Sequence, residues 1–287
     1  MMPPADWTPT VTTPGLYPEL AEIYHGRRHT PTRALSYSGI KCLLNETPLD
    51  FVTPKERKSD DMNFGSVVHS MALGRGAKFS VSPFDDYRTK DARAWRDDTI
   101  AEGLIPIKAD AFADASAMAE IIRAKIQRAL NGEPYQTEVP FFWQENSTWF
   151  SGMMDVWCPT LRTVIDPKTT GKVHEFDREI TRFGYHIQSA LYRRGLDAIF
   201  PESAGRHQFK TLPIATEPPY TSRLISISEA WRAGAEADIG RAVRIFETCE
   251  RTGIWPGYPD EETMDEPSWQ MKLRAEREMA DEYDDAA

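Results

Sequence analysis

Two aspartates, a glutamate and a lysine lie at the ends of predicted strands. Glu138 opens the first strand, Asp155 lies near the end of the second, and Asp166-Pro167-Lys168 ends the third. Carboxylates at the ends of adjacent antiparallel strands can converge on one point, and Mg²⁺ prefers such oxygen ligands. Lys168 should lie on the same side of its strand as Asp166. There it could orient or deprotonate a metal-activated water and stabilise charge on a phosphate.

The same residues also have an ordinary structural interpretation. Aspartate and lysine are common near strand ends, so a single Asp-X-Lys triplet is a weak signal. Asp155, however, lies in the otherwise apolar run Met-Met-Asp-Val-Trp. Because a buried carboxylate without a partner is costly, this position requires a cation or a hydrogen-bond donor beside it.

Two helical segments carry further polar residues on one face. Gly65 and His69 form a Gly-X-X-X-His pattern before the strands. After the strands, Tyr185, Gln188 and Tyr192 are spaced by three and four residues, which places them on one helix face. Taken alone, such a histidine is more often a packed core residue than a functional one, and the second pattern is more often a packing stripe than a site.

The elements that must position these residues follow from apolar periodicity and turn residues. The expected core is a helix, a three-strand antiparallel meander, a helix and a strand, with added helices, which is a mixed α/β fold. Helices are predicted over 38–44, 64–73, 109–130, 180–200 and 228–251, the first and last capped by serines. Strands are predicted over 138–143, 148–157, 162–166, 209–214 and 221–227, and Pro48 should end the first helix.

Charge and length suggest how the chain is organised. The 287 residues carry a formal charge of −10. Residues 260–287 hold eleven acidic and three basic residues, a charge of −8. The remaining 259 residues are therefore nearly neutral, and an acidic overall charge does not exclude an anionic partner. We expect an irregular N-terminal arm over 1–18, one domain over 19–257, and an acidic tail over 258–287 that adds nothing to the core.

Several classes of protein are excluded by what the sequence lacks. Cys42, Cys158 and Cys249 are far apart and form no Cys-X-X-Cys pair, so a four-cysteine iron–sulfur cluster or zinc ribbon is not expected. No run of 18 apolar residues is present, and the first residues do not read as a secretory signal. We expect a cytoplasmic protein.

Taken together, these motifs form a recognisable series. The series resembles the RecB-like branch of the PD-(D/E)XK nuclease superfamily, and within it the C-terminal nuclease domain of exodeoxyribonuclease VIII (RecE) and related phage or prophage exonucleases. The resemblance runs from about residue 20 to 257, and implies a restriction-endonuclease-like core. In order, the motifs are Tyr-His-Gly (24–26), Leu-Ser-Tyr-Ser-Gly-Ile-Lys-Cys-Leu-Leu (35–44), Gly-Ser-Val-Val-His (65–69), Glu138, Gly-Met-Met-Asp (152–155), Asp-Pro-Lys-Thr-Thr (166–170) and Tyr-His-Ile-Gln-Ser-Ala-Leu-Tyr (185–192).

The resemblance implies a role for each of these positions. Metal ligands would be His69, Asp155, Asp166 and the carbonyl of Pro167, with Asp166 at a position where many relatives carry glutamate. Lys168 would position the attacking water. Glu138 would serve a second metal or orient water, and Gln188 would hydrogen-bond near the lysine or the DNA backbone. Mg²⁺ is the implied metal, with Mn²⁺ as a substitute.

Contacts to DNA are less clearly marked. Ser36, Ser38 and Lys41 lie at a predicted helix start, where free N–H groups favour phosphate, although ordinary N-capping is the more frequent role of residues placed there. The other candidates for DNA contact lie on the predicted helix over 180–200 and are Tyr185, Tyr192 and Arg193.

The implied activity is exonucleolytic hydrolysis of linear duplex DNA, 5′ to 3′. The surviving 3′ strand would serve a single-strand annealing protein in recombination, and the enzyme would be a homo-oligomeric ring, with Trp7 and Tyr17 of the arm available for packing. Two alternatives stay open: a RecB-like nuclease of other polarity or structure specificity, and a non-catalytic DNA-binding module on the same fold.

Overall fold

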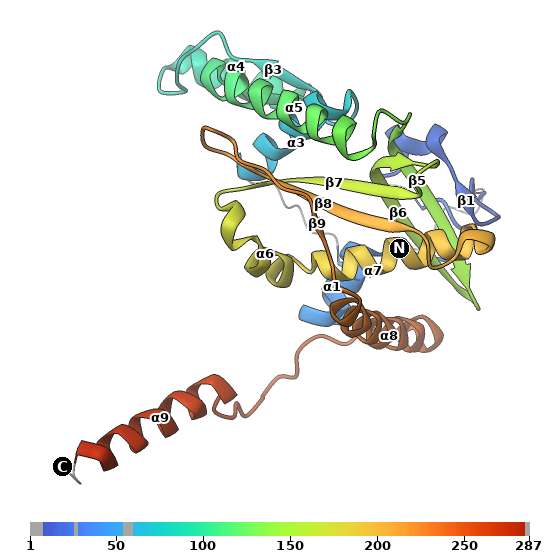
Figure 1. Ribbon diagram of the computed structural model, residues 1–287, viewed down its shortest axis with the longest axis vertical. Helices are drawn as coiled ribbons and strands as arrows, with labels where there is room; N and C mark the ends of the chain where they lie inside the picture. The colour runs from blue at the N-terminus through green and yellow to red at the C-terminus, as the bar shows by residue number, and fades with distance from the viewer. Residues whose placement is uncertain (1–7, 26–27, 54–59, 285–287) are drawn as a thin grey trace. The chain divides into compact units, whose positions relative to one another are not determined.

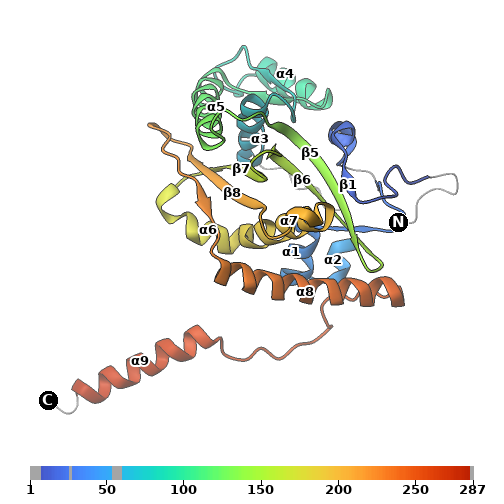
Figure 2. The same ribbon diagram turned by 45° about the vertical axis from the view of Figure 1, so that its right-hand side comes forward.

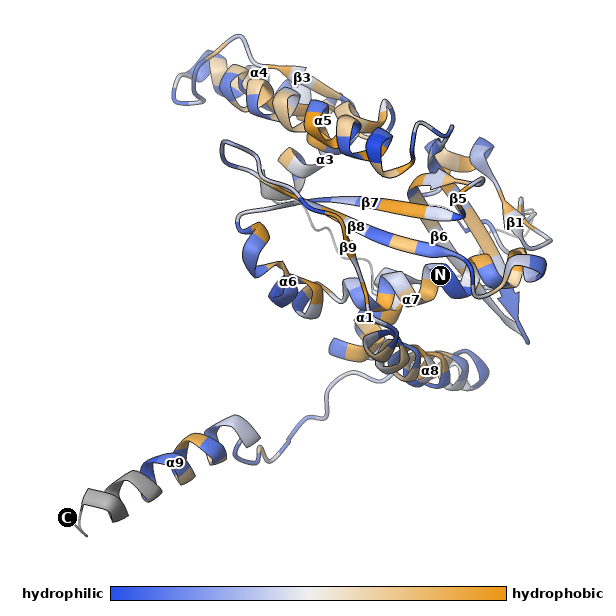
Figure 3. Ribbon diagram, viewed as in Figure 1, coloured by the Kyte–Doolittle hydropathy of each residue, from blue (hydrophilic) through white to orange (hydrophobic). Residues whose placement is uncertain are grey.

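The computed structural model describes residues 8–25, 28–53 and 60–284. They fall into two compact units, the first ending at Trp255 and the second beginning at Pro256. The second unit contains α9 (Ser268–Asp284), a helix within the acidic tail that the sequence did not predict. Residues 268–278 of this helix are mostly hydrophilic (Figure 3), and Trp269 and Met271 are exposed. Among the described residues, no helix is both long enough and apolar enough to traverse a membrane.

A mixed sheet forms the centre of the first unit. Its path runs β1-β5-β6-β7-β8-β9, and β2 pairs in parallel with β6. As predicted, β5, β6 and β7 form an antiparallel meander, and β8 joins β7 in parallel. The strands of this sheet are β1 (Gly15–Leu16), β2 (Ala34–Ser36), β5 (Gln136–Glu145), β6 (Thr148–Cys158), β7 (Thr163–Thr170), β8 (Gln208–Ala215) and β9 (Ile225–Ser226).

Helices cover both faces of the sheet (Figures 1 and 2). One face carries α3 (Asp60–Leu73) and α5 (Ala109–Ala129), which pack on each other around the apolar stripe of α5. The other carries α1 (Tyr37–Asn45), α7 (Tyr185–Ile199) and α8 (Glu229–Thr252) over a second core cluster. The remaining elements of the first unit are α2 (Pro48–Val52), α4 (Lys90–Ala101), α6 (Phe176–Phe183), three short 3₁₀ helices (Pro18–Ile23, Val173–Glu175, Pro201–Ser203), and β3 (Phe79–Val81) paired with β4 (Ile105–Ile107).

Aromatic residues hold α7 close against the meander. Phe141 and Trp143 are two residues apart on β5 and therefore lie on the same face, where their ring centroids are 5.2 Å apart. Trp143 also stacks on Phe150 of β6, with ring centroids 5.1 Å apart. Gly195 of α7 lies directly over these rings, since a Cβ added there would be 2.7 Å from Trp143. The missing side chain therefore lets α7 approach the sheet.

Both predicted serine caps are confirmed. The Ser36 hydroxyl accepts a hydrogen bond from the Gly39 N–H at the start of α1, and Ser228 accepts one from Trp231 at the start of α8. The prediction of a single helix over 180–200 was wrong, because Gly184 adopts a left-handed φ of 78° and separates α6 from α7. Without a Cβ, glycine takes this conformation at no steric cost.

Other elements differ from the sequence-based expectation. Pro48 begins α2 after a Thr47 capping box, so it starts a helix as well as following one. Part of the N-terminal stretch expected to be irregular pairs with β5 as β1, and Val11 is fully buried. The aperiodic stretch 77–108 contains β3, α4 and β4, the strand predicted over 221–227 is shortened to β9, and β7 continues past Asp166 to Thr170.

The close approach of α7 to the sheet predicts a contrast between two glycine substitutions in helix interiors. Gly195→Ala should lower the free energy of unfolding by about 1–3 kcal/mol, because the added methyl collides with Trp143 and Phe141. Gly234→Ala in α8 meets nothing within 4 Å and should raise it by about 0.5–1 kcal/mol through helix propensity. Chemical denaturation of both variants measures the difference, and equal effects would contradict the packing described.

Candidate active site

The sheet opens between β6 and β7, and the two aspartates lie where it opens. These strands pair from Cys158 with Thr163 to Val156 with Ile165. The next residue along each strand is an aspartate, Asp155 on β6 and Asp166 on β7. Beyond this point β7 continues its pairing with β8, while β6 pairs with β2. The fork therefore places two carboxylates side by side at the inner end of a gap in the sheet.

Glu138 lies across from Asp155 in the β5–β6 ladder. Thr137 pairs with Val156 and Val139 with Met154, so the intervening positions face each other. Glu138 has a φ of 53°, a conformation that is unfavourable for a residue with a Cβ and costs on the order of 1–3 kcal/mol. Such strain persists only where surrounding contacts enforce it, and here it turns the glutamate toward the aspartate.

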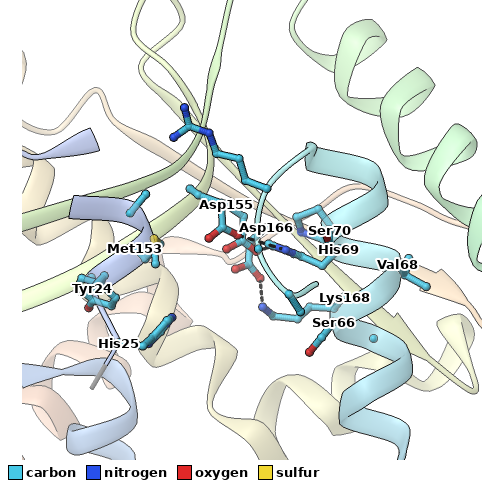
Figure 4. A pocket seen from close by; sticks show the side chains of 18 of the residues that line it. Tyr24, His25, Ser66, Val68, His69, Ser70, Met153, Asp155, Asp166 and Lys168 are labelled. Atoms are coloured by element: carbon cyan, nitrogen blue, oxygen red, sulfur yellow. Dashed lines mark ion pairs between the residues drawn. The ribbon is translucent and has the colours of Figure 1, made fainter. Parts of the chain in front are cut away.

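His69 of α3 lies between these two carboxylates, and Figure 4 shows it beside Asp155. Its Nε2 lies 3.1 Å from Asp155 Oδ2, and its Nδ1 lies 3.3 Å from Glu138 Oε1. One ligand atom from each of the three residues lies within 4.8 Å of the others. We call His69, Glu138 and Asp155 the acidic cluster.

Asp166 is held by Lys168 and Gln188. Its Oδ2 lies 2.6 Å from Lys168 Nζ in an ion pair, and its Oδ1 accepts a hydrogen bond of 3.0 Å from the Gln188 amide of α7. The ammonium group of Lys168 also lies 5.4 Å from the ring centre of Tyr185.

The electrostatics of the site are dominated by burial and by crowding of like charges. Burial raises the pKa of Asp166, and the neighbouring Asp155 adds to this against the opposing charge of Lys168. Burial also raises the pKa of Asp155, but the opposing effect of His69 is larger, so the pKa of Asp155 is lowered overall. Burial would lower the pKa of His69, yet Asp155 and Glu138 raise it. His69 thus compensates the negative charge of Asp155 and Glu138.

A large cleft opens over these groups, with a volume of about 1560 Å³. Pro167, Gln188, Tyr185, Ser36 and Ser38 line it together with the acidic cluster, Asp166 and Lys168. The structure therefore brings together, from four separate stretches of chain, the residues that the sequence singled out as candidate catalytic and metal-binding groups.

The remaining three candidates for DNA contact are nearly buried or lie outside the cleft. Tyr192 lines the cleft but is only 6% exposed, and its hydroxyl accepts a hydrogen bond from the Met153 N–H, so it supports β6. Arg193 pairs with Glu229 at 2.9 Å and lines a separate hollow. Lys41 lies over the ring of Phe183.

Sequence reasoning missed three residues that line the cleft. Arg75 and Lys78 follow α3, and Tyr37 begins α1 with its hydroxyl donating to the Phe183 carbonyl. The Gly-Arg-Gly triplet at 74–76 carries no chemical signal of its own beyond the helix end that glycines favour. Its position five to seven residues after His69 was the available indication that it lies near the site.

The comparisons with known proteins agree with this architecture. Residues 47–264 match the family described as PDDEXK-like domain of unknown function (DUF3799). The chain belongs to this family. A candidate exonuclease from Eubacterium rectale has a similar crystal structure, with a TM-score of 0.52 and 16% identity over 84% of this chain and 92% of its own. At that identity the likeness concerns the fold, which is the predicted restriction-endonuclease-like fold.

A second solved structure is more distant. A phage-related exonuclease from Haemophilus somnus 129PT has 12% identity over 82% of this chain and all of its own, but a TM-score of only 0.30 carries no structural argument. No curated protein sequence matches the chain. Family membership and the site geometry together support a nuclease.

The residues present fit a divalent cation. The acidic cluster offers one imidazole and two carboxylates whose ligand atoms lie within 4.8 Å of one another, and Asp166 adds a buried carboxylate beside them. Oxygen-rich sets of this kind suit Mg²⁺ and Mn²⁺, and a cation would also remove the repulsion between the two aspartates. His69, Glu138, Asp155 and Asp166 would hold it.

Metal binding should be visible as a change in stability. Mg²⁺ or Mn²⁺ should raise the Tm of the parent protein, because a ligand that binds only the folded state stabilises it. Asp155→Ala should lose this shift, and Lys168→Ala should keep it, since the lysine is not a ligand. Asp85→Ala, on the exposed loop before α4, is the control. Thermal scans with and without metal test this, and an unchanged shift in Asp155→Ala would remove Asp155 from the ligand set.

Proposed function

We propose that this protein is a metal-dependent exodeoxyribonuclease that degrades linear duplex DNA from its ends, 5′ to 3′. The observation that supports hydrolysis is the convergence of the acidic cluster, Asp166 and Lys168 at the fork of the sheet. The preference for duplex ends and the 5′ to 3′ polarity rest on the sequence resemblance to RecE-like exonucleases.

Each group has a distinct role in the proposed reaction. A bound divalent cation would supply Lewis acidity and lower the pKa of a water molecule. Lys168, fixed by its ion pair with Asp166, lies where it can donate to the attacking water and to the phosphate oxygens. Gln188 holds the Asp166 carboxylate in one orientation through Oδ1, leaving Oδ2 directed at the site. Tyr192 fixes β6 two residues before Asp155.

Two alternative functions, a non-catalytic binding module and a RecB-like nuclease of other specificity, make different demands on these residues. A non-catalytic binding module would have no need of Lys168 beside a buried carboxylate pair, whereas hydrolysis requires it. A RecB-like nuclease with other polarity or structure specificity would use the same site. Rates on duplexes labelled at the 5′ or 3′ end, and on a closed circular duplex, distinguish these enzymes.

Removing single side chains from the site should abolish turnover without unfolding the protein. Asp155→Ala, Asp166→Ala and Lys168→Ala should each reduce the nuclease rate by three orders of magnitude or more, roughly 4 kcal/mol at about 1.36 kcal/mol per tenfold. His69→Ala should be severe and partly relieved by extra Mn²⁺. Lys168→Ala should retain most metal and DNA binding, because its interaction is made mainly in the transition state.

The measurement is the rate on a 5′-phosphorylated linear duplex with Mg²⁺, accompanied by circular dichroism of each variant. Asp85→Ala and Lys90→Ala, both exposed and outside the cleft, are the matched controls. Well-folded Asp166→Ala and Lys168→Ala proteins that cut within tenfold of the parent would show the assignment to be wrong.

The proposed partners follow from the same resemblance. A 3′ single strand left by the enzyme would be taken up by a single-strand annealing protein in recombination. The acidic residues 260–287, which form their own unit with α9, would repel DNA from neighbouring surfaces or dock a basic partner.

A ring-shaped homo-oligomer would enclose the duplex and keep the enzyme on its substrate. The two aromatic residues suggested for its contacts give no support, because Tyr17 packs against Phe142 at 5.7 Å in the same chain and Trp7 lies outside the described residues. Light scattering at micromolar concentration should show a mass of several subunits. A strict monomer would exclude the ring.

A further inference from the structure

The loop that follows α3 is built to place two cations at the cleft. Gly74 ends the helix with a φ of 73°, and its N–H donates to the Ser70 carbonyl at 2.8 Å, five residues after His69. Gly76, with a φ of 111°, passes so close to the acidic cluster that an added Cβ would lie 3.7 Å from both Glu138 Oε1 and His69 Nδ1. Arg75 lies between these glycines at the mouth of the cleft.

The far end of the loop is anchored to the small β3–β4 sheet. The Lys78 carbonyl accepts a hydrogen bond of 2.9 Å from the Ile105 N–H, and the next residue, Phe79, packs on Phe112 of α5 with ring centroids 6.0 Å apart. The Lys78 side chain is exposed and lines the same cleft. The loop is therefore tied down at both ends, with its two cationic side chains directed outward.

Arg75 and Lys78 differ from the other cations at this site in having no partner. Within the described ranges 8–25, 28–53 and 60–284, neither side chain makes a hydrogen bond or an ion pair, whereas Lys168 is paired with Asp166. Arg75 still acts through space on Glu138, since it lowers the pKa of that carboxyl against the larger effect of burial. We call these two side chains the cationic rim.

The cleft needs such charges if its ligand is a polyanion. Glu22, Glu138, Asp155 and Asp166 all line it, and a nucleic-acid backbone approaching this surface is repelled except where a cation compensates. Unpaired arginine and lysine side chains provide that compensation, and arginine can also contact two oxygens of one phosphate at once. Tyr24, Tyr37 and Tyr185 also line the cleft and contribute no positive charge.

We propose that Arg75 and Lys78 bind neighbouring backbone phosphates of the strand that is cut, and so set which phosphodiester lies over the acidic cluster. This inference rests on the proposed nuclease function and extends it to residues outside the nuclease motifs. Arg75, nearest the cluster, holds the phosphate at or beside the scissile bond, and Lys78 holds the next one toward the β3–β4 sheet. An exposed loop that served only solubility would not need a glycine at position 76 beside His69 and Glu138.

The test measures binding separately from cleavage. Arg75→Gln, Lys78→Gln and the double variant are compared with Arg88→Gln and Lys90→Gln, which remove the same charges from exposed positions outside the cleft. Affinity for a fluorescent single-stranded oligonucleotide and for a duplex is measured by anisotropy with Ca²⁺ in place of Mg²⁺, over a range of salt concentrations. Circular dichroism and Tm confirm that every variant is folded.

Each lost phosphate contact should reduce the slope of log affinity against log salt by about 0.7 on the single strand and about 0.9 on duplex. The double variant should lose about twice this, the controls should match the parent, and Arg75→Lys should restore the slope. With Mg²⁺, Arg75→Gln should raise KM at least tenfold and shift the positions of the cleavage products.

The outcomes separate this inference from the proposed function. If the parent binds and cuts but the rim variants keep the parental salt slope and KM, the rim assignment is overturned and the nuclease stands. If the parent binds without cutting, and the rim variants lose slope, the rim is supported while the catalytic proposal fails. A parent that binds neither oligonucleotide overturns both.

Discussion

The structure depends on two like charges being kept next to each other out of water. Asp155 and Asp166 are adjacent at the fork between β6 and β7, and burial disfavours the ionised form of both. His69 of α3 and Lys168 of β7 compensate these charges at 3.1 Å and 2.6 Å. Because removing such a partner leaves a charge uncompensated, α3 and β7 have to keep their positions relative to the two carboxylates.

The side chains that surround the two aspartates come from different elements of the fold. α3 brings His69 from one face of the sheet, α7 brings Gln188 from the other, and the strained Glu138 closes the set from β5. The same α3 then ends in a glycine that turns the chain back over the cluster. A single helix thus supplies both a group that contacts the carboxylates and the cations at the mouth of the cleft.

The sequence predicted what depends on local spacing and missed what depends on distant pairing. The meander, the long α5 and the α1 and α8 caps follow from periodicity and capping residues, and the motif order identified the acidic cluster, Asp166, Lys168 and Gln188. Nothing local distinguishes Gly184 as a helix break from a tolerated helix glycine. Likewise, the burial of Tyr192 and the pairing of Arg193 with Glu229 arise from packing between elements far apart in the chain.

The parallel pairing of β2 with β6 has a consequence for how the protein is made. Ser36 pairs with Ser151, which follows 115 residues later in the chain. At about 5–20 residues per second, a ribosome needs roughly 6–23 s to synthesise that interval. During this time Leu35, Ile40 and Leu43, all buried in the finished core, have no sheet to cover them. The nascent chain therefore carries an uncovered apolar segment, a natural site for a chaperone, until the meander emerges and the wall of the cleft can close.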